Sequence, residues 1–310
     1  MIKSIRLRSQ QLSRPAFDRP EEAVSWMGAV QAQHHAMSKW AVGIRLKAGG
    51  GEAVERALRE GKILRTHVMR PTWHLVAAED LRWMLKLSAS RIRAANDSLA
   101  RTHGLELTER FYARCNRLLE DMLRGHKSLT RQEIAQELER AGIPADAPRM
   151  TRLLMRAETE GIVCSGVDRD GTHTYALLEE RVTPARELHR EEALARLAEK
   201  YFRSHSPATL SDFVWWSGLP LTEARRAIGS LGARLVSLRF GVRELLVHES
   251  WKGTDNAAGH EVHFLPPYDE YLLGYKDRSD VLASEFRARA FNAWGVFYPV
   301  VSYGGRIVGN

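Results

Sequence analysis

Residues 128–138, Ser-Leu-Thr-Arg-Gln-Glu-Ile-Ala-Gln-Glu-Leu, carry the pattern that decides the fold. Glu133 follows Thr130 at the spacing that lets two side chains satisfy the exposed backbone amides at a helix start. The stretch therefore predicts a helix that begins at Thr130 and runs to Gly142.

The segments on either side of this helix complete one compact unit. An amphipathic run over 109–125 predicts a helix before it, and residues 150–160 predict a third helix after a break containing two prolines. Residues 161–166 and 172–178 flank the turn Asp-Arg-Asp-Gly at 168–171 and predict a hairpin. Three helices followed by a hairpin describe a winged helix-turn-helix.

The same order of elements recurs on both sides of the middle unit. The later copy is predicted to hold helices and strands over 190–203, 208–216, 222–231, 233–239 and 242–248. The first third is predicted to hold helices over 20–30 and 51–60 and a hairpin over 63–76. The predicted fold class is α+β, mainly α, with three tandem winged helix-turn-helix units over 1–103, 104–184 and 185–255.

The pattern changes beyond residue 260. Short strands are predicted near 262–268 and 296–308, with a charged helical stretch between them. We expect residues 256–310 to form a small β-rich, barrel-like unit.

Composition excludes several classes of protein. The 310 residues are 44% hydrophobic and 27% charged, which is typical of a folded chain with a sizeable core. The two cysteines form no CxxC pair, so a disulfide framework and a cysteine zinc site are excluded and both thiols are expected to be buried. No stretch resembles a membrane span or a secretory signal, which favours a cytoplasmic protein with no membrane partner.

Common enzyme motifs are absent from the chain. The sequence contains no phosphate-binding glycine loop, no HExxH helix and no GxSxG elbow. We therefore expect no metal and no cofactor.

The positive charge is concentrated in the first third. The formal net charge is +8, and residues 1–103 hold 18 of the 46 Lys and Arg residues but 9 of the 38 Asp and Glu residues. That segment therefore carries +9 and the remainder −1. Such segregation is expected if the first unit lies against the phosphates of a nucleic acid; the alternative is a basic, solvated surface.

The segment Val-Gln-Ala-Gln-His-His over 30–35 is the main candidate for chemistry. On an extended backbone Gln31 and Gln33 project to the same side, so the two amides can hold one water or one sugar-phosphate group. On a helix they diverge, and the alternative is a solvated helix end. His34 and His35 either contact phosphate or are solvated.

Basic residues of the first unit are candidates for contacts with DNA. In the predicted hairpin over 63–76, Arg65, His67, Arg70 and His74 are expected on a polar face directed at DNA. Pro71 indicates that the hairpin has an edge strand or a bend at this point. The alternative is that its polar face contacts solvent rather than DNA.

Two further cations outside this hairpin are weighed in the same way. They are Lys39 and Arg45.

Several of these stretches together resemble a known family. They are Ala-Val-Gln-Ala-Gln over 29–33, Lys-Trp-Ala-Val-Gly-Ile-Arg over 39–45, the run over 65–76, and Leu-Pro-Pro-Tyr-Asp-Glu-Tyr-Leu-Leu-Gly-Tyr-Lys-Asp-Arg over 265–278. In this order they resemble the winged-helix DNA glycosylases of the AlkZ/YcaQ type, over nearly the whole chain. The resemblance implies a C-shaped protein of three winged helices plus a β-barrel, which grips duplex DNA and excises alkylated purines, including interstrand crosslinks.

The resemblance also implies roles for individual residues. The family's catalytic QxQ or QxD motif falls on Gln31 and Gln33, and Gln at the second position is similar to the AlkZ-like branch, so a carboxylate general base is not expected. The stretch over 265–278, here called the late motif, contains Asp269, Tyr275 and Arg278. These residues either support the active site or join the barrel to the third winged helix. Residues 305–310 resemble a barrel strand that relatives continue, which predicts a truncated or open barrel.

The substrate explains how two amides can suffice. An N7-alkylated purine already carries positive charge, so it leaves without a strong acid, and the protein has to orient water and stabilise the sugar cation. We therefore expect a monomeric, monofunctional DNA glycosylase for cationic alkylated purines. The alternatives are a winged-helix transcriptional regulator without enzymatic activity and a self-resistance enzyme for one natural-product adduct.

Overall fold

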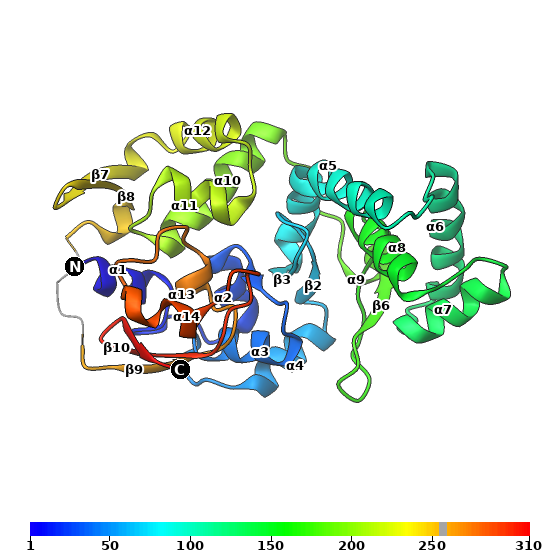
Figure 1. Cartoon of the computed structure of the whole chain (residues 1–310), viewed down its shortest axis with the longest axis horizontal. Coiled ribbons are helices and arrows are strands. Elements are labelled where there is room, and N and C mark those ends of the chain that lie inside the picture. The colour runs from blue at the N-terminus through cyan, green and yellow to red at the C-terminus, as the bar shows by residue number, and fades with distance from the viewer. Residues whose placement is uncertain (254–258) are drawn as a thin grey trace. The chain divides into compact units, whose positions relative to one another are not determined.

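The computed structural model describes residues 1–253 and 259–310 (Figure 1). These residues divide into two compact units. The terminal unit combines Met1–Glu55 with Leu188–Asn310, and the central unit is the continuous segment Arg56–Glu187. The predicted boundary between the third unit and the C-terminal unit, at residues 255 and 256, lies within residues 254–258, which are outside the described residues. The division into four parts stays a prediction.

The central unit alternates helices with short antiparallel strands. Its elements are β2 (Ile63–His67), β3 (Trp73–Ala77), α5 (Ala78–Thr102), α6 (Glu109–Leu123), β4 (Leu129–Thr130), α7 (Arg131–Arg140), α8 (Ala147–Thr159), β5 (Val163–Ser165), β6 (Thr174–Leu177) and α9 (Leu178–Arg181). The strands after α6 form a sheet of order β4-β6-β5, and β2 pairs antiparallel with β3. The elements from α6 to β6 match those predicted for the middle unit, whereas β2 and β3 form the hairpin predicted for the first unit.

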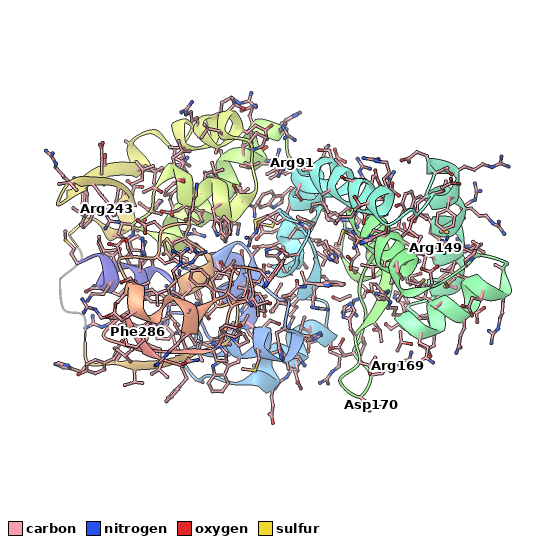
Figure 2. The ribbon with its side chains drawn as sticks, in the orientation of Figure 1. Arg91, Arg149, Arg169, Asp170, Arg243 and Phe286 are labelled. Atoms are coloured by element: carbon pink, nitrogen blue, oxygen red, sulfur yellow. The ribbon has the colours of Figure 1, made fainter. Side chains whose placement is uncertain are left out.

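The predicted helix start at Thr130 is confirmed atom by atom. The Thr130 hydroxyl accepts a hydrogen bond from the Glu133 backbone N–H at 3.2 Å, and the Glu133 carboxylate accepts one from the Thr130 N–H at 2.7 Å. Both exposed amides are thus satisfied, which fixes the first residue of α7. The predicted turn is also present: Figure 2 shows Arg169 and Asp170 at the tip of the loop between β5 and β6.

The C-terminal half of α8 is enclosed by its neighbours. Residues 153–159 of α8 are all buried, and α8 packs against the 25-residue helix α5 as well as α6. Its apolar side chains, including Leu153 and Leu154, belong to the core of the unit together with Leu119 and Ile134. The C-terminal half of α8 is therefore enclosed by protein, whereas Ala147 and Pro148 at its start are exposed.

The terminal unit is assembled from both ends of the chain. Its N-terminal elements are α1 (Ile2–Ser9), α2 (Pro20–Met27), β1 (Val30–Gln31), α3 (His35–Gly43) and the start of α4 (Gly51–Arg59). Its later elements are α10 (Arg190–His205), α11 (Leu210–Ser217), α12 (Leu221–Gly229), η1 (Gly232–Arg234), β7 (Leu235–Phe240), β8 (Arg243–His248), η2 (Glu249–Trp251), β9 (Val262–Leu265), α13 (Glu270–Leu273), η3 (Ser284–Phe286), α14 (Arg287–Ala290), β10 (Val300–Tyr303) and β11 (Arg306–Gly309). α10 packs against α2 and α12, so the two ends of the chain share one unit.

The predicted β-rich unit at the C-terminal end is present, but the described residues form no closed barrel. They form an open, three-stranded antiparallel sheet of order β11-β10-β9, in which Val301 pairs with Phe264 and Tyr303 pairs with Arg306. Three strands of four residues leave two unpaired edges and cannot close. The charged stretch between the strands contains only short helices, α13, η3 and α14.

Both cysteines are buried, as predicted. Burial raises the pKa of the Cys115 thiol to about 11 and that of Cys164 to about 12. Both thiols are therefore protonated and unreactive at neutral pH.

The length and apolar character of the described helices bear on membrane crossing. None of them combines the length and the apolar character that crossing a membrane requires.

Candidate active site

The segment that carries the two glutamines is positioned by a glycine. α2 ends at Gly28, whose backbone φ of +81° is rarely adopted by residues that carry a side chain. A Cβ at this position would lie 3.3 Å from the Trp216 ring and 3.4 Å from Lys200 Cβ. Gly28 therefore lets the chain turn out of α2, close to α10 and α11, and enter β1.

Gln31 and Gln33 lie in different environments. Gln31 is the last residue of β1, so its backbone is extended as the QxQ prediction requires, and the residue is only 5% exposed. Gln33 lies beyond the strand, in the turn that leads to α3, and is exposed. Gln33 is thus the more accessible of the two residues; the extended strand ends at Gln31, and the joint hold of one water by both amides stays a prediction.

The two histidines after the motif differ in the same way. His34 is exposed and caps α3, because its Nδ1 accepts a hydrogen bond from the Met37 N–H at 3.4 Å. His35 is the first residue of α3 and is half-buried. His34 therefore has a local structural role, and a contact of either ring with phosphate stays a prediction.

An apolar cavity lies along the helix that follows the motif. Its volume is about 400 Å³, and its lining begins at Ala36, three residues after Gln33. Met37, Trp40 and Ile44 of α3 form one wall, and the glycines at 49–51 form another. The Trp40 indole N–H donates to the Phe264 carbonyl at 2.9 Å, which fixes the ring as part of the wall.

A buried carboxylate of the motif over 265–278, for which no role was predicted, contacts the backbone of Gln31. The Gln31 backbone N–H donates to Glu270 Oε1 at 2.8 Å, and the Trp216 indole N–H donates to Glu270 Oε2 at 3.1 Å. Glu270 is completely buried. Both carboxylate oxygens accept hydrogen bonds from N–H groups of the protein, which is not the arrangement of a metal ligand.

The predicted DNA contact of Arg45 is wrong. Arg45 is completely buried, and its guanidinium donates two parallel hydrogen bonds to the Asp269 carboxylate at 2.9 and 2.8 Å. It also donates to the Ala41 carbonyl and to the Gln10 side chain. A buried guanidinium has to be paired in this way, and it cannot reach a phosphate.

Lys39, in contrast, is not sealed in the interior. It is half-buried and its ammonium lies 2.9 Å from the carboxylate of Glu55, which is itself half-exposed. Solvent screening keeps such a pair weak.

The residues of the late motif brace the terminal unit. Asp269 is 3% exposed and caps α13 by accepting from the Tyr271 N–H at 2.9 Å. The Tyr275 hydroxyl donates to the His205 carbonyl at 3.0 Å and accepts from Gln10 at 3.2 Å, and burial raises its pKa. Arg278 stacks over aromatic rings, with Phe291 4.9 Å away. These contacts tie helices from both ends of the chain together.

The polar face predicted for the first hairpin is not exposed. Arg65 is 7% exposed and stacks over the Trp73 ring at 4.0 Å, and burial lowers its pKa. His67 is 6% exposed and hydrogen-bonds to the buried Glu158. His74 is completely buried against the Thr72 carbonyl. The predicted DNA contacts of Arg65, His67 and His74 are therefore wrong in this structure, whereas Arg70 is half-buried.

Two buried histidines predict that stability falls in acid. Burial lowers the pKa of His74 well below 6.5, and burial also lowers the pKa of His205. The unfolded chain therefore binds more protons than the folded chain once the pH falls below about 6.5. We expect the free energy of unfolding to have its full value above that pH. Below it, the free energy of unfolding should decrease by up to about 1.4 kcal/mol per pH unit for each histidine.

Denaturant unfolding at pH 7.5 and pH 5.5 measures this decrease. A His74→Gln variant should show a shallower dependence on pH than the wild type. Equal stability of the wild type at the two pH values would contradict the prediction.

Three comparisons with known proteins identify the family of this chain and its relatives. The family described as DNA glycosylase AlkZ-like matches residues 24–310. The interstrand DNA cross-link repair glycosylase of Streptomyces sahachiroi is 26% identical over 331 residues, covering 98% of this chain and 85% of that protein. The solved structure of the Streptomyces sahachiroi DNA glycosylase AlkZ superposes with a TM-score of 0.81 at 24% identity, covering 99% of this chain and 85% of the other. The last comparison shows a shared mixed α/β fold.

Proposed function

Because the chain belongs to the AlkZ-like family of DNA glycosylases, we propose that it hydrolyses the N-glycosidic bond of cationic N7- and N3-alkylated purines in double-stranded DNA. The proposal includes the unhooking of interstrand crosslinks, by a monomer that uses no metal and no cofactor. The observation that carries it is the QxQ segment itself. An accessible amide at Gln33 directly follows a buried, fixed strand that ends at Gln31.

The reaction needs little from the protein. The C1′–N9 bond breaks, its electron pair goes to the purine, and the positive charge of the alkylated base moves to the sugar. Water then adds to C1′ and releases its proton to solvent, which leaves the neutral alkylated base and an abasic sugar. The steps to be accelerated are the formation of the sugar cation and the approach of the water.

Gln33 is proposed to orient the attacking water and to stabilise the sugar cation. Its exposed amide oxygen can accept a hydrogen bond from the attacking water and direct the negative end of its dipole at the developing cation. Gln31 is held behind it on β1 and limits where the segment can move. The cavity of about 400 Å³ that begins at Ala36 gives room for a substituent much larger than a methyl group.

We also propose that the three helical units are winged helices and that DNA is held by charge rather than by sequence readout. The concentration of positive charge in residues 1–103 supports binding through the phosphates. Lys39 and Arg70 are retained as proposed contacts with phosphate.

Base release by the purified wild-type chain tests the proposed function. We expect release of N7-methylguanine from a duplex that contains this lesion, and no release of guanine from the same duplex without it. A duplex crosslinked through N7 of guanine should be converted to separate strands after the abasic site is cleaved.

Binding measurements separate this function from that of a transcriptional regulator. A glycosylase that searches for lesions should bind unrelated duplexes with similar affinity and a steep dependence on salt. No release from any cationic lesion, together with strong preference for one duplex sequence, would assign the chain to the regulators instead.

A further inference from the structure

The carboxylate of Glu270 lies directly behind the proposed catalytic strand. Its Oε1 accepts from the Gln31 backbone N–H at 2.8 Å, so one hydrogen bond joins it to the QxQ motif. Its Oε2 accepts from the Trp216 indole N–H at 3.1 Å. Glu270 and Trp216 are both completely buried. The carboxylate is therefore fixed on two sides, in an environment that weakens electric fields far less than water does.

Within the described residues, Glu270 faces dipoles rather than a cation. The two N–H donors are uncharged, and the remaining neighbour is the His205 ring, whose Nε2 lies 3.5 Å from Oε2. Burial has the largest effect on the pKa of His205 and lowers it; the hydrogen bond and charge of Glu270 raise it in part, and Arg45 lowers it again, so the net shift is downward and the ring is neutral at neutral pH. The guanidinium of Arg45 is itself bound to Asp269 on both oxygens.

A brace alone does not require a charged side chain. A buried glutamine would also accept a hydrogen bond from the Gln31 N–H, and burying an ion without a partner of opposite charge is costly. What a carboxylate adds is negative charge. The QxQ amides contribute dipoles, and the reaction places positive charge on the sugar next to them.

We infer that Glu270 is a positioning residue whose buried negative charge acts through Gln31 to favour the cationic transition state at the QxQ motif. The inference rests on the proposed glycosylase function. It assigns the charge that the two glutamines lack to a residue 239 positions away in the sequence.

Two substitutions of Glu270 separate charge from bracing. Glu270→Gln keeps the size and one acceptor but removes the charge, whereas Glu270→Asp keeps the charge but shortens the side chain. If charge is the contribution, single-turnover release of N7-methylguanine falls about 10-fold or more in E270Q, and E270D is faster than E270Q. The dissociation constant for the duplex should change less than about 2-fold in both, because the buried side chain does not contact DNA.

The opposite order of rates overturns the inference. If E270Q is as fast as or faster than E270D, the residue acts only as a hydrogen-bond acceptor. All rates are measured well below the melting temperature of each variant. If E270Q does not fold, the same comparison is made in the Trp216→Phe background, which removes the indole N–H that would face the new amide group.

A matched buried carboxylate provides the control. Asp212 is 1% exposed and accepts backbone N–H groups, including that of Lys276 at 2.8 Å, but no hydrogen bond joins it to the QxQ segment in the described structure. Asp212→Asn should lower the melting temperature and leave the single-turnover rate within about 2-fold of the wild type. A rate loss in D212N as large as that in E270Q would also overturn the inference. Absence of base release by the wild type would instead refute the proposed function.

Discussion

Asp269→Asn is expected to lower the free energy of unfolding of the terminal unit by about 3–5 kcal/mol. The substitution leaves the guanidinium of Arg45 buried without its counter-charge. The two side chains are 1% and 2% exposed, and their closest N–O distance is 2.8 Å. Asparagine can still accept the hydrogen bond from the Tyr271 N–H that caps α13, so the loss reports on the ion pair rather than the cap.

Denaturant unfolding at pH 7, followed by tryptophan fluorescence, measures this loss. Asp18→Asn is the matched control, since Asp18 binds Lys47 at the same kind of distance, 2.9 Å, but the side chains are 70% and 50% exposed. Its cost should be at most about 1 kcal/mol because solvent screens the pair. Replacing both partners, Arg45→Met with Asp269→Asn, should recover part of the stability. Equal losses in D269N and D18N would show that burial adds nothing to this pair.

The difference between the predicted and the observed environment of Arg45 shows what a single sequence can and cannot predict. A basic residue in a basic segment looks like a contact for phosphate, and nothing nearby in the sequence contradicts that interpretation. Its partner Asp269 lies 224 positions away, so only the tertiary fold shows that the charge is neutralised inside the protein. Glu270 escapes notice for the same reason, because the motif that it supports is equally distant in the chain.

Local signals, in contrast, predicted local structure well. The capping box at Thr130 and the turn at 168–171 are decided by residues within a few positions of each other, and both are present. α5 was missed because it begins at Ala78 directly after a strand, with no side-chain cap at its start. α3 was missed because its cap is His34, which is an unusual residue for that role. A closed barrel is not seen in the described residues, because that part of the prediction depended on the family resemblance, whereas the three short strands present form an open sheet.

The hairpin over 63–76 illustrates a further limit. Polar side chains that alternate with apolar ones normally indicate an exposed face. Here that face is buried, because Arg65 stacks on Trp73 and His67 binds Glu158 of α8. Periodicity identifies the two faces of a strand, but it does not say whether the polar face meets solvent or other polar groups.

Gln33→Ala is expected to reduce single-turnover release of N7-methylguanine by about 10²–10³-fold, the range found when one preorganised polar group of an active site is removed. Gln33 is exposed and lies outside β1, so its loss should neither unfold the chain nor change the dissociation constant for the duplex by more than about 2-fold. Gln136, an exposed glutamine of α7, is the matched control, and Gln136→Ala should retain the wild-type rate. Gln31→Ala should also be slow, but with a lower melting temperature, since its side chain is almost completely buried.

Gln33→Glu tests why the amide works. If Gln33 acts by presenting an oxygen to water and to the sugar cation, glutamate places an oxygen at the same reach and adds negative charge, so the rate should stay within about 10-fold of the wild type. If Gln33 acts by donating a hydrogen bond from its NH₂ group, glutamate cannot replace it and the variant should be as slow as Q33A. A wild-type rate in Q33A would remove the accessible amide from the chemistry altogether. Gln31, which binds Glu270 through its backbone N–H, would then be the glutamine of the QxQ pair left to act, and the rate of Q31A would decide whether it does.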